Sequence, residues 1–309
     1  MLLTPAMIAE SLEPATLEAA SAASAALEEY RAEFTADDAV FAAAFARAEA
    51  AASAALAGVD ADARATGLAR LGLAASADAR NAASILQATL VAPSLDAVAV
   101  HEAIDPGGDP ASGLPDLPDL RDSAVSMLVP VALGHAYLVA RRPFFLGNAR
   151  TARALSSAQL STPLAPLPLS GGLLADATVY RSALGAYGRG DANPIVLVLA
   201  RAVHAAIDDA RDLATALAIT RDDWDAAMVG VRSHAASRRL VPVVFENPVI
   251  DARLTVPALG VTLAAAYTSI ETLVERGILE PRGAERRNRA WFAPGILDAV
   301  DAFVERARA

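Results

Sequence analysis

Long alanine-rich stretches with helical spacing run through most of this chain, and they restrict what it can fold into. Residues 15–104 carry alanine and larger apolar residues three and four positions apart, with charged residues between them. Thr35 is suited to cap the start of one such helix, with Asp37 and Asp38 in its first turn. Before about residue 240 no stretch shows a strand pattern. The sequence therefore predicts an all-α fold.

Breaks in the helical pattern divide the chain further. Residues 105–120 are rich in Pro, Gly and Asp and predict a long loop. The next helix should end at Arg141, because Pro143 disfavours helix in the residue before it. Helix should resume at about Asn148. A proline-rich break is expected at 161–172, followed by helices over 177–191, 192–217 and 221–240.

The residues after 240 have a different pattern. They predict a short helix, a turn at Gly260, a second helix that ends before Gly277, and a hairpin with strands at 278–282 and 289–293. This is the element order of a winged helix-turn-helix. A chain of 309 residues is longer than one hydrophobic core usually organises. We therefore expect an N-terminal helical region over 1–104, a core over 105–240 and a winged helix over 241–309.

Composition excludes several classes of chemistry. The chain has no cysteine and no lysine, so disulfides, thiolate metal sites and lysine-based catalysis are excluded. A net charge of −10 disfavours a non-specific nucleic-acid binder. The most apolar window, 126–140, contains Pro130 and Gly134 and is too short to span a membrane. With no secretory signal pattern either, we expect a cytoplasmic protein, and the use of arginine and alanine is typical of a GC-rich bacterial genome.

The stretch "RPFFLGNARTAR", residues 142–153, is the most specific motif. Three arginines fall within it, and Gly147 and Asn148 stand where a helix is expected to start. Backbone N–H groups at a helix start bind anions, because they are unpaired and the helix dipole is positive there. On the residues alone, arginines that are solvated or paired with acidic side chains are favoured over an anion site.

These residues resemble the motif of the Fic-domain family, which reads His-Pro-Phe-x-Asp/Glu-Gly-Asn-Gly-Arg-x-x-Arg between two helices. His135 lies seven residues before Arg142, as a histidine does in many members, and the resemblance covers about residues 120–309. It implies a Fic-like helical core and transfer of AMP from ATP to a hydroxyl group of a target protein. The motif histidine is the base, the acidic residue holds magnesium, and the Gly-Asn-Gly backbone and the two arginines bind the phosphates.

Three positions depart from the motif. Arg142 takes the place of the base, and a guanidinium has no acceptor for a proton. Leu146 takes the place of the metal carboxylate, and an alkyl side chain cannot bind magnesium. Ala149 replaces a glycine. Loss of a general base alone costs about 100- to 10,000-fold in rate.

The resemblance and its departures together predict a pseudoenzyme. Gly147, Asn148, Arg150 and Arg153 are the expected nucleotide-binding residues, with ATP or another phosphate compound as ligand and no metal. One alternative is an enzyme with altered chemistry that uses Arg142 as an electrostatic clamp on a phosphorylated substrate. The other is a transcriptional regulator that reads DNA through its C-terminal module.

Partners follow from the same reading. We expect an unidentified protein target or partner and no membrane association, and a homodimer stays open. DNA binding is open but not favoured, because Glu246 to Ala309 holds eight arginines against nine acidic residues. Arg286, Arg287 and Arg289 would form a basic wing, whereas the recognition helix would begin with alanines. The four histidines show no metal-ligand spacing.

Overall fold

The computed structural model describes residues 11–73, 76–107, 126–283 and 288–309. Its helical elements, with η for short 3₁₀ helices, are α2 (Pro14–Ala32), η1 (Ala36–Phe41), α3 (Ala42–Leu56), α4 (Ala63–Arg70), α5 (Ala77–Val91), η2 (Ala92–Ser94), α6 (Ala97–Ile104), α7 (Leu128–Arg141), α8 (Asn148–Leu160), α9 (Leu169–Leu174), α10 (Ala177–Gly188), α11 (Asn193–Ala227), α12 (Ala236–Glu246), α13 (Ala252–Leu259), α14 (Leu263–Glu275) and α15 (Pro294–Arg308). The strands are β1 (Val249–Ile250), β2 (Glu280–Pro281) and β3 (Trp291–Phe292). The predicted all-α class is confirmed.

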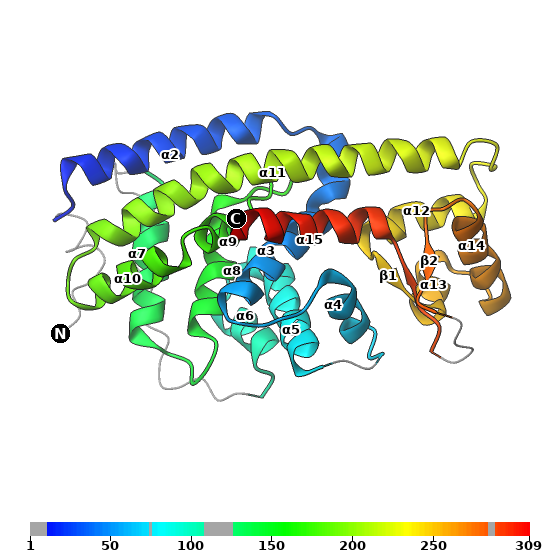
Figure 1. Cartoon of the computed structure of the whole chain (residues 1–309), viewed down its shortest axis with the longest axis horizontal. Helices are drawn as coiled ribbons and strands as arrows, with labels where there is room; N and C mark the ends of the chain where they lie inside the picture. Colours follow the sequence, from blue (N-terminus) through cyan, green and yellow to red (C-terminus); the bar gives the residue numbers. More distant parts are fainter. Residues whose placement is uncertain (1–10, 74–75, 108–125, 284–287) are drawn as a thin grey trace.

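One long helix organises the bundle. Helix α11 has 35 residues, and α2 runs alongside it (Figure 1). Asn193, at the start of α11, accepts hydrogen bonds through Oδ1 from the backbone N–H of Glu13 and the hydroxyl of Thr16, both at 2.9 Å. The prediction of separate helices over 192–217 and 221–240 was wrong. Nothing between them breaks a helix, and the chain leaves helix only near Gly230, which has φ +84°.

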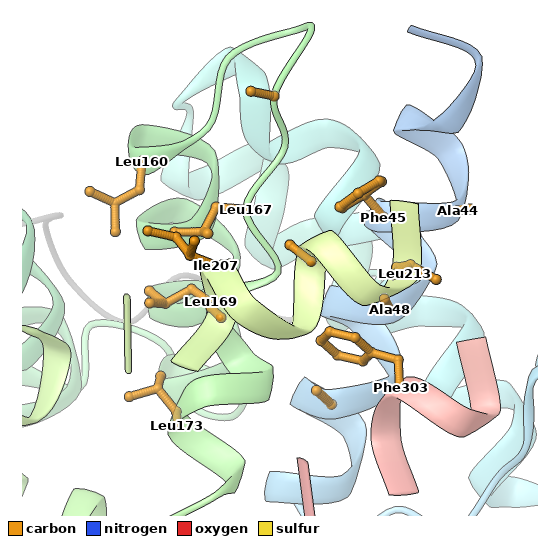
Figure 2. Packing of buried hydrophobic residues seen from close by; sticks show 14 of the residues in the cluster. Ala44, Phe45, Ala48, Leu160, Leu167, Leu169, Leu173, Ile207, Leu213 and Phe303 are labelled. Atoms are coloured by element: carbon orange, nitrogen blue, oxygen red, sulfur yellow. The ribbon is translucent and has the colours of Figure 1, made fainter. Parts of the chain in front are cut away.

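The hydrophobic core is continuous from the N-terminal helices to the C-terminal one. Figure 2 shows Phe45 of α3, Leu213 of α11 and Phe303 of α15 in the same part of it. Many of the other core residues are alanines, which allow helix axes to approach closely. The three expected parts of the chain therefore share a core, and a division into separate domains stays a prediction.

Helix α9 lies inside the segment that was expected to be a proline-rich break. Residues 161–168 are not helical, but Leu169–Leu174 form α9, which packs on α11, α3 and α15. Its two glycines explain the packing. A Cβ on Gly171 would lie 2.5 Å from the ring of Phe303, and one on Gly172 would lie 2.1 Å from the carbonyl oxygen of Ala202. Tertiary contact thus overrides the weak helix propensity of glycine.

The C-terminal residues form the predicted hairpin and one strand more. β2 and β3 pair antiparallel, with Glu280 opposite Phe292. Strand β1, which is too short to show a sequence period, pairs with the other edge of β3. Gly260 and Gly277 both have positive φ and end α13 and α14 as expected. The winged helix as a separate module stays a prediction, and its expected boundary after residue 240 falls inside α12.

The chain leaves the hairpin as α15, which returns to pack on α3, α4, α9 and α11. The segment 105–120 and the hairpin turn with Arg286 and Arg287 lie largely or wholly outside the described residues. Among the described helices, the stretch Ala36–Leu56 is long and apolar enough to cross a membrane by length and composition. It is mostly buried against other helices, which accounts for its apolar character.

Helix packing at the glycines of α9 gives a direct test of the core. Gly172→Ala should lower the free energy of unfolding by about 2 kcal/mol or more, because the added Cβ would collide with the backbone of α11. Gly134→Ala, in α7, is the matched control, because its Cβ would meet nothing within 4 Å. That change should stabilise the protein by roughly 0.5–1 kcal/mol. Denaturant unfolding measures both, and equal effects would contradict this packing.

Candidate functional site

The motif loop joins α7 to α8, and the residue at each end of the loop has a left-handed backbone conformation. Helix α7 ends at Arg141, and Arg142 follows in the left-handed region with φ +50°. Gly147, with φ +74°, precedes α8, which begins at Asn148 as the sequence predicts. Ala149 has no positive φ, so replacement of the motif's glycine by alanine is compatible with this backbone. The loop is therefore a complete turn between helices.

Asn148 closes this loop from inside. Its side chain accepts a hydrogen bond from the backbone N–H of Phe144 at 3.0 Å and donates one to the carbonyl oxygen of Phe144 at 2.7 Å. Phe144 is buried, and its ring stacks on His101 of α6 with ring centroids 3.8 Å apart. Asn148 is itself buried. It therefore holds the loop in shape rather than facing a ligand with its side chain.

The start of α8 has the geometry of an anion site. No side chain caps its first turn among the described residues, so the N–H groups there are available. Arg150 folds back over this turn, with Nη2 3.8 Å from the position that a Cβ on Gly147 would take. That same Cβ would lie 2.9 Å from Ile104, so glycine is required for space as well as for its φ.

Charge near Arg150 is only partly compensated. Burial lowers the pKa of the Arg150 guanidinium, Arg153 lowers it further, and Asp105 opposes both. In the part of the chain that the structure describes, Arg150 is in no ion pair. A bound anion would therefore meet a guanidinium that is not already neutralised at close range.

The exposed side of the loop includes Arg142 and Leu146, two of the positions at which the sequence departs from the Fic motif. Arg142 is exposed, and Phe145 and Leu146 are 80% and 50% exposed. None of the three can accept a proton or bind a hard cation. Within the described residues, no group of three or more His, Asp or Glu side chains could hold a metal ion. These exposed side chains therefore supply neither a proton acceptor nor a ligand for a hard cation.

Arg153, which the resemblance places among the phosphate ligands, points into the protein. It is 3% exposed. Its Nε donates to the hydroxyl of Ser53 at 2.9 Å, and its Nη2 donates to the carbonyl oxygen of Ser53 at 3.0 Å. This contact joins residues 100 positions apart, and no local sequence pattern reveals it. The position of Arg153 supports a structural role, so we do not retain it as a ligand residue.

A buried carboxylate accompanies this arginine. Glu49 of α3 accepts hydrogen bonds from the backbone N–H of Ser170, at 2.7 Å, and from the Ser170 hydroxyl. Burial raises the pKa of Glu49 to about 7, although the Ser170 hydrogen bonds and the nearby charge of Arg153 act against that rise. Glu49 and Arg153 therefore connect α3, α8 and α9 through polar groups in the interior.

His135 is buried and makes two side-chain hydrogen bonds. Its ring nitrogens lie 3.0 Å from the hydroxyl of Ser156 and 2.9 Å from that of Tyr180. Burial, together with the charge of Arg153, lowers the pKa of His135 to about 3. The imidazole is therefore neutral at physiological pH and ties α7 to α8 and α10.

His101 was not singled out by the sequence analysis, yet it lies next to the loop. It is 2% exposed, and neither ring nitrogen has a hydrogen-bond partner among the described residues. Its Nδ1 would be 3.7 Å from a Cβ on Gly147. Burial lowers the pKa of His101, Asp105 raises it and Arg150 lowers it. Only the fold brings residue 101 to a motif about forty residues later, so no sequence signal indicated it.

The C-terminal hairpin holds Arg289 over aromatic rings. Its guanidinium carbon lies 4.8 Å from the ring centroid of Trp291 and 5.5 Å from that of Tyr267. Tyr267 of α14 packs edge-on against Trp291. Both side chains are therefore already engaged in intramolecular packing, and DNA contact stays a prediction.

Comparison with solved structures places this arrangement of helices among known folds. The chain is similar to the crystal structure of a Fic family protein from Desulfovibrio desulfuricans G20, with 16% sequence identity and a TM-score of 0.53. The match covers 91% of this chain and 96% of that chain. No model of a protein family matches the sequence, and no curated protein matches it. The Fic-like fold expected from the motif is therefore confirmed by structure, at a level of identity that speaks for fold alone.

The buried carboxylate predicts a specific pH dependence of stability. The folded protein keeps the proton of Glu49 up to about pH 7, whereas the unfolded chain releases it near 4.5. The unfolded state therefore binds fewer protons in this window, and stability falls as pH rises. Relative to Glu49→Gln, the free energy of unfolding should fall between pH 4.5 and 7 by on the order of 3 kcal/mol, then level off.

His135 is present in both proteins, so its titration cancels in this difference. Glu18→Gln, at an exposed position of α2, controls for the loss of one charge. Urea unfolding across the pH range is the measurement. If the free energy of unfolding of the parent protein relative to Glu49→Gln does not change with pH, or increases with pH, Glu49 is not a buried acid with a raised pKa.

Proposed function

We propose that this chain is a Fic-fold protein that does not transfer AMP and that binds a phosphate compound at the start of α8. The ligand is ATP or another phosphate, held without a metal ion. The observation that carries the proposal is the position of Arg150 over the uncapped first turn of α8. A helix start with available N–H groups and a close guanidinium is a general anion-binding arrangement.

The proposed lack of AMP transfer rests on the residues at two loop positions, Arg142 and Leu146. The resemblance implies a histidine base where Arg142 lies, and a guanidinium stays protonated and has no lone pair to accept a proton. His135 cannot substitute, because it is buried and both of its ring nitrogens are engaged. His101 is also buried and faces the interior side of the loop against Phe144.

The metal position supports the same conclusion. The resemblance implies a carboxylate where Leu146 stands, and that side chain is exposed and apolar. A magnesium ion contributes several kcal/mol of charge stabilisation when phosphoryl groups react. The loop of this chain supplies no oxygen ligand at that position, so a bound phosphate would meet only N–H groups and guanidinium.

The proposed phosphate binding rests on contacts of the loop that do not involve Arg142 or Leu146. Asn148 still closes the loop on Phe144, and Gly147 still gives α8 its uncapped start. Arg150 supplies the charge. Arg153 contributes indirectly, because its contacts with Ser53 fix α8 from below. The anion site is thus the exposed end of a helix that is anchored in the core.

The first test is for AMP transfer. We expect no protein to be labelled above background when the purified chain is incubated with labelled ATP, magnesium and bacterial extract, since base and metal carboxylate are both missing. Loss of the base alone should reduce the rate by about 100- to 10,000-fold. Strong labelling that disappears in Arg150→Ala would overturn the proposal of inactivity.

The second test is for binding. Inorganic phosphate and ATP should bind with an affinity that is the same with magnesium and with EDTA, because the site offers no metal ligand. Arg150→Ala should weaken binding by about tenfold, the loss of one charge-assisted hydrogen bond. Arg201→Ala, at an exposed position of α11, is the matched control and should bind normally. Calorimetry measures these affinities. Binding that requires magnesium, or no binding of either ligand, would contradict the proposed site.

A further inference from the structure

A cavity lies away from the motif loop. It has a volume of about 100 Å³ and lies between α3, α4 and α5 on one side and the segment around β1, with α15, on the other. None of its lining residues belongs to the loop 142–153. A buried water needs roughly 10–15 Å³ measured in this way, so the cavity has room for a ligand of several heavy atoms.

Two arginines line this cavity. Arg47 of α3 is half-buried, and its Nη1 donates to the carbonyl oxygen of Ala43 at 2.8 Å, one turn earlier in the same helix. Arg70, the last residue of α4, is more exposed and lies at the rim. Among the described residues neither arginine is in an ion pair. Two positive charges therefore meet at one cavity without a carboxylate in contact.

The electrostatics of the pair are unfavourable in the empty protein. Burial, together with the charge of Arg70 and against that of Glu246, lowers the pKa of Arg47 to about 9. Burial also lowers the pKa of Arg70, again opposed by Glu246. Glu246 influences both arginines from beyond ion-pair distance. A carboxylate placed between the two guanidinium groups would relieve both burial and repulsion.

We propose that this cavity binds a small organic carboxylate with an apolar body. The arginines hold the carboxylate group, and the apolar body lies against the rest of the lining. That lining is mostly alkyl: Leu71, Leu86, Val249, Leu254, Leu297 and Val300. A cavity with apolar walls and a few convergent polar groups is the usual form of a small-molecule site.

A carboxylate suits the cavity better than a phosphate. Phosphate sites usually add backbone N–H groups at a helix start. The start of α4 faces this region, but carboxylates of the protein already occupy it. The N–H of Ala63 donates to Asp301 at 2.9 Å, and that of Ala65 donates to Asp62 at 2.6 Å. The donors left for a ligand are guanidinium groups, which match a planar carboxylate.

The site connects distant parts of the chain. Arg47 and Arg70 come from the N-terminal helices, whereas Asn247, Pro248 and Val249 precede the C-terminal helices. A ligand that contacts both sides stabilises their association, because it binds only when they are together. This site is independent of the loop at α8, so its test does not depend on phosphate binding there.

The experiment uses hexanoate and benzoate as probes with the full chain. Both should raise the melting temperature and give saturable binding in calorimetry below about 10 mM. Arg47→Met and Arg70→Met keep the apolar stem and should each weaken binding by about tenfold or more. Arg47→Met should not lower the melting temperature without ligand, because it removes a desolvated, repelled charge. Arg70→Met, at the rim, keeps the test valid if Arg47→Met does not fold.

Three controls separate this site from non-specific effects. Arg201→Met, on the exposed face of α11, should bind both probes as the parent does. Hexylamine has the apolar body with the opposite charge and should not bind. Inorganic phosphate should compete with bound hexanoate at least about tenfold more weakly than benzoate does. The proposal is overturned if neither carboxylate binds, if both cavity variants bind normally, if hexylamine binds as tightly as hexanoate, or if phosphate displaces hexanoate as well as benzoate does.

Discussion

The placement of the motif loop depends on a guanidinium in the interior. Arg153 is buried, and its hydrogen bonds to Ser53 fix α8 against α3. A buried charge without partners would cost several kcal/mol, so the hydroxyl and carbonyl acceptors of Ser53 are a condition for this arrangement. Because α8 is fixed one turn below its start, the uncapped N–H groups and Arg150 are presented at a defined place. The exposed site is a consequence of the buried contact.

Small side chains provide the second condition. Alanine fills much of the core, and glycine occurs where backbones come closest, as at Gly172 against Ala202. Gly67 is a further instance, since a Cβ there would lie 2.2 Å from Val249. That contact joins α4 to β1, on the wall of the arginine-lined cavity. The same close packing therefore holds the C-terminal strands against the N-terminal helices and shapes the second proposed site.

Local signals predicted the local features of this fold and no more. The helix start at Asn148, the ends at Gly260 and Gly277, and the hairpin all follow from residues within a few positions of one another. The missed features are long-range. Helix α9 needs the contacts of Gly171 and Gly172 with distant elements, and β1 exists only as a partner of β3. For the candidate site, the roles of Gly147 and Arg150 stay a prediction from the sequence, whereas burial of Arg153 and proximity of His101 could be recognised only from the fold.

Within the loop, three residues that match the Fic motif and two that depart from it differ in exposure. Pro143, Phe144 and Asn148 match it and are buried, whereas Arg142 and Leu146 depart from it and are exposed. The buried residues stabilise the turn through the hydrogen bonds of Asn148 and the packing of Phe144. Replacing an exposed residue removes a reactive group but breaks none of these contacts. The loop can therefore keep its shape and the helix start whatever residues stand at the exposed positions, because the contacts that hold it lie on its opposite side.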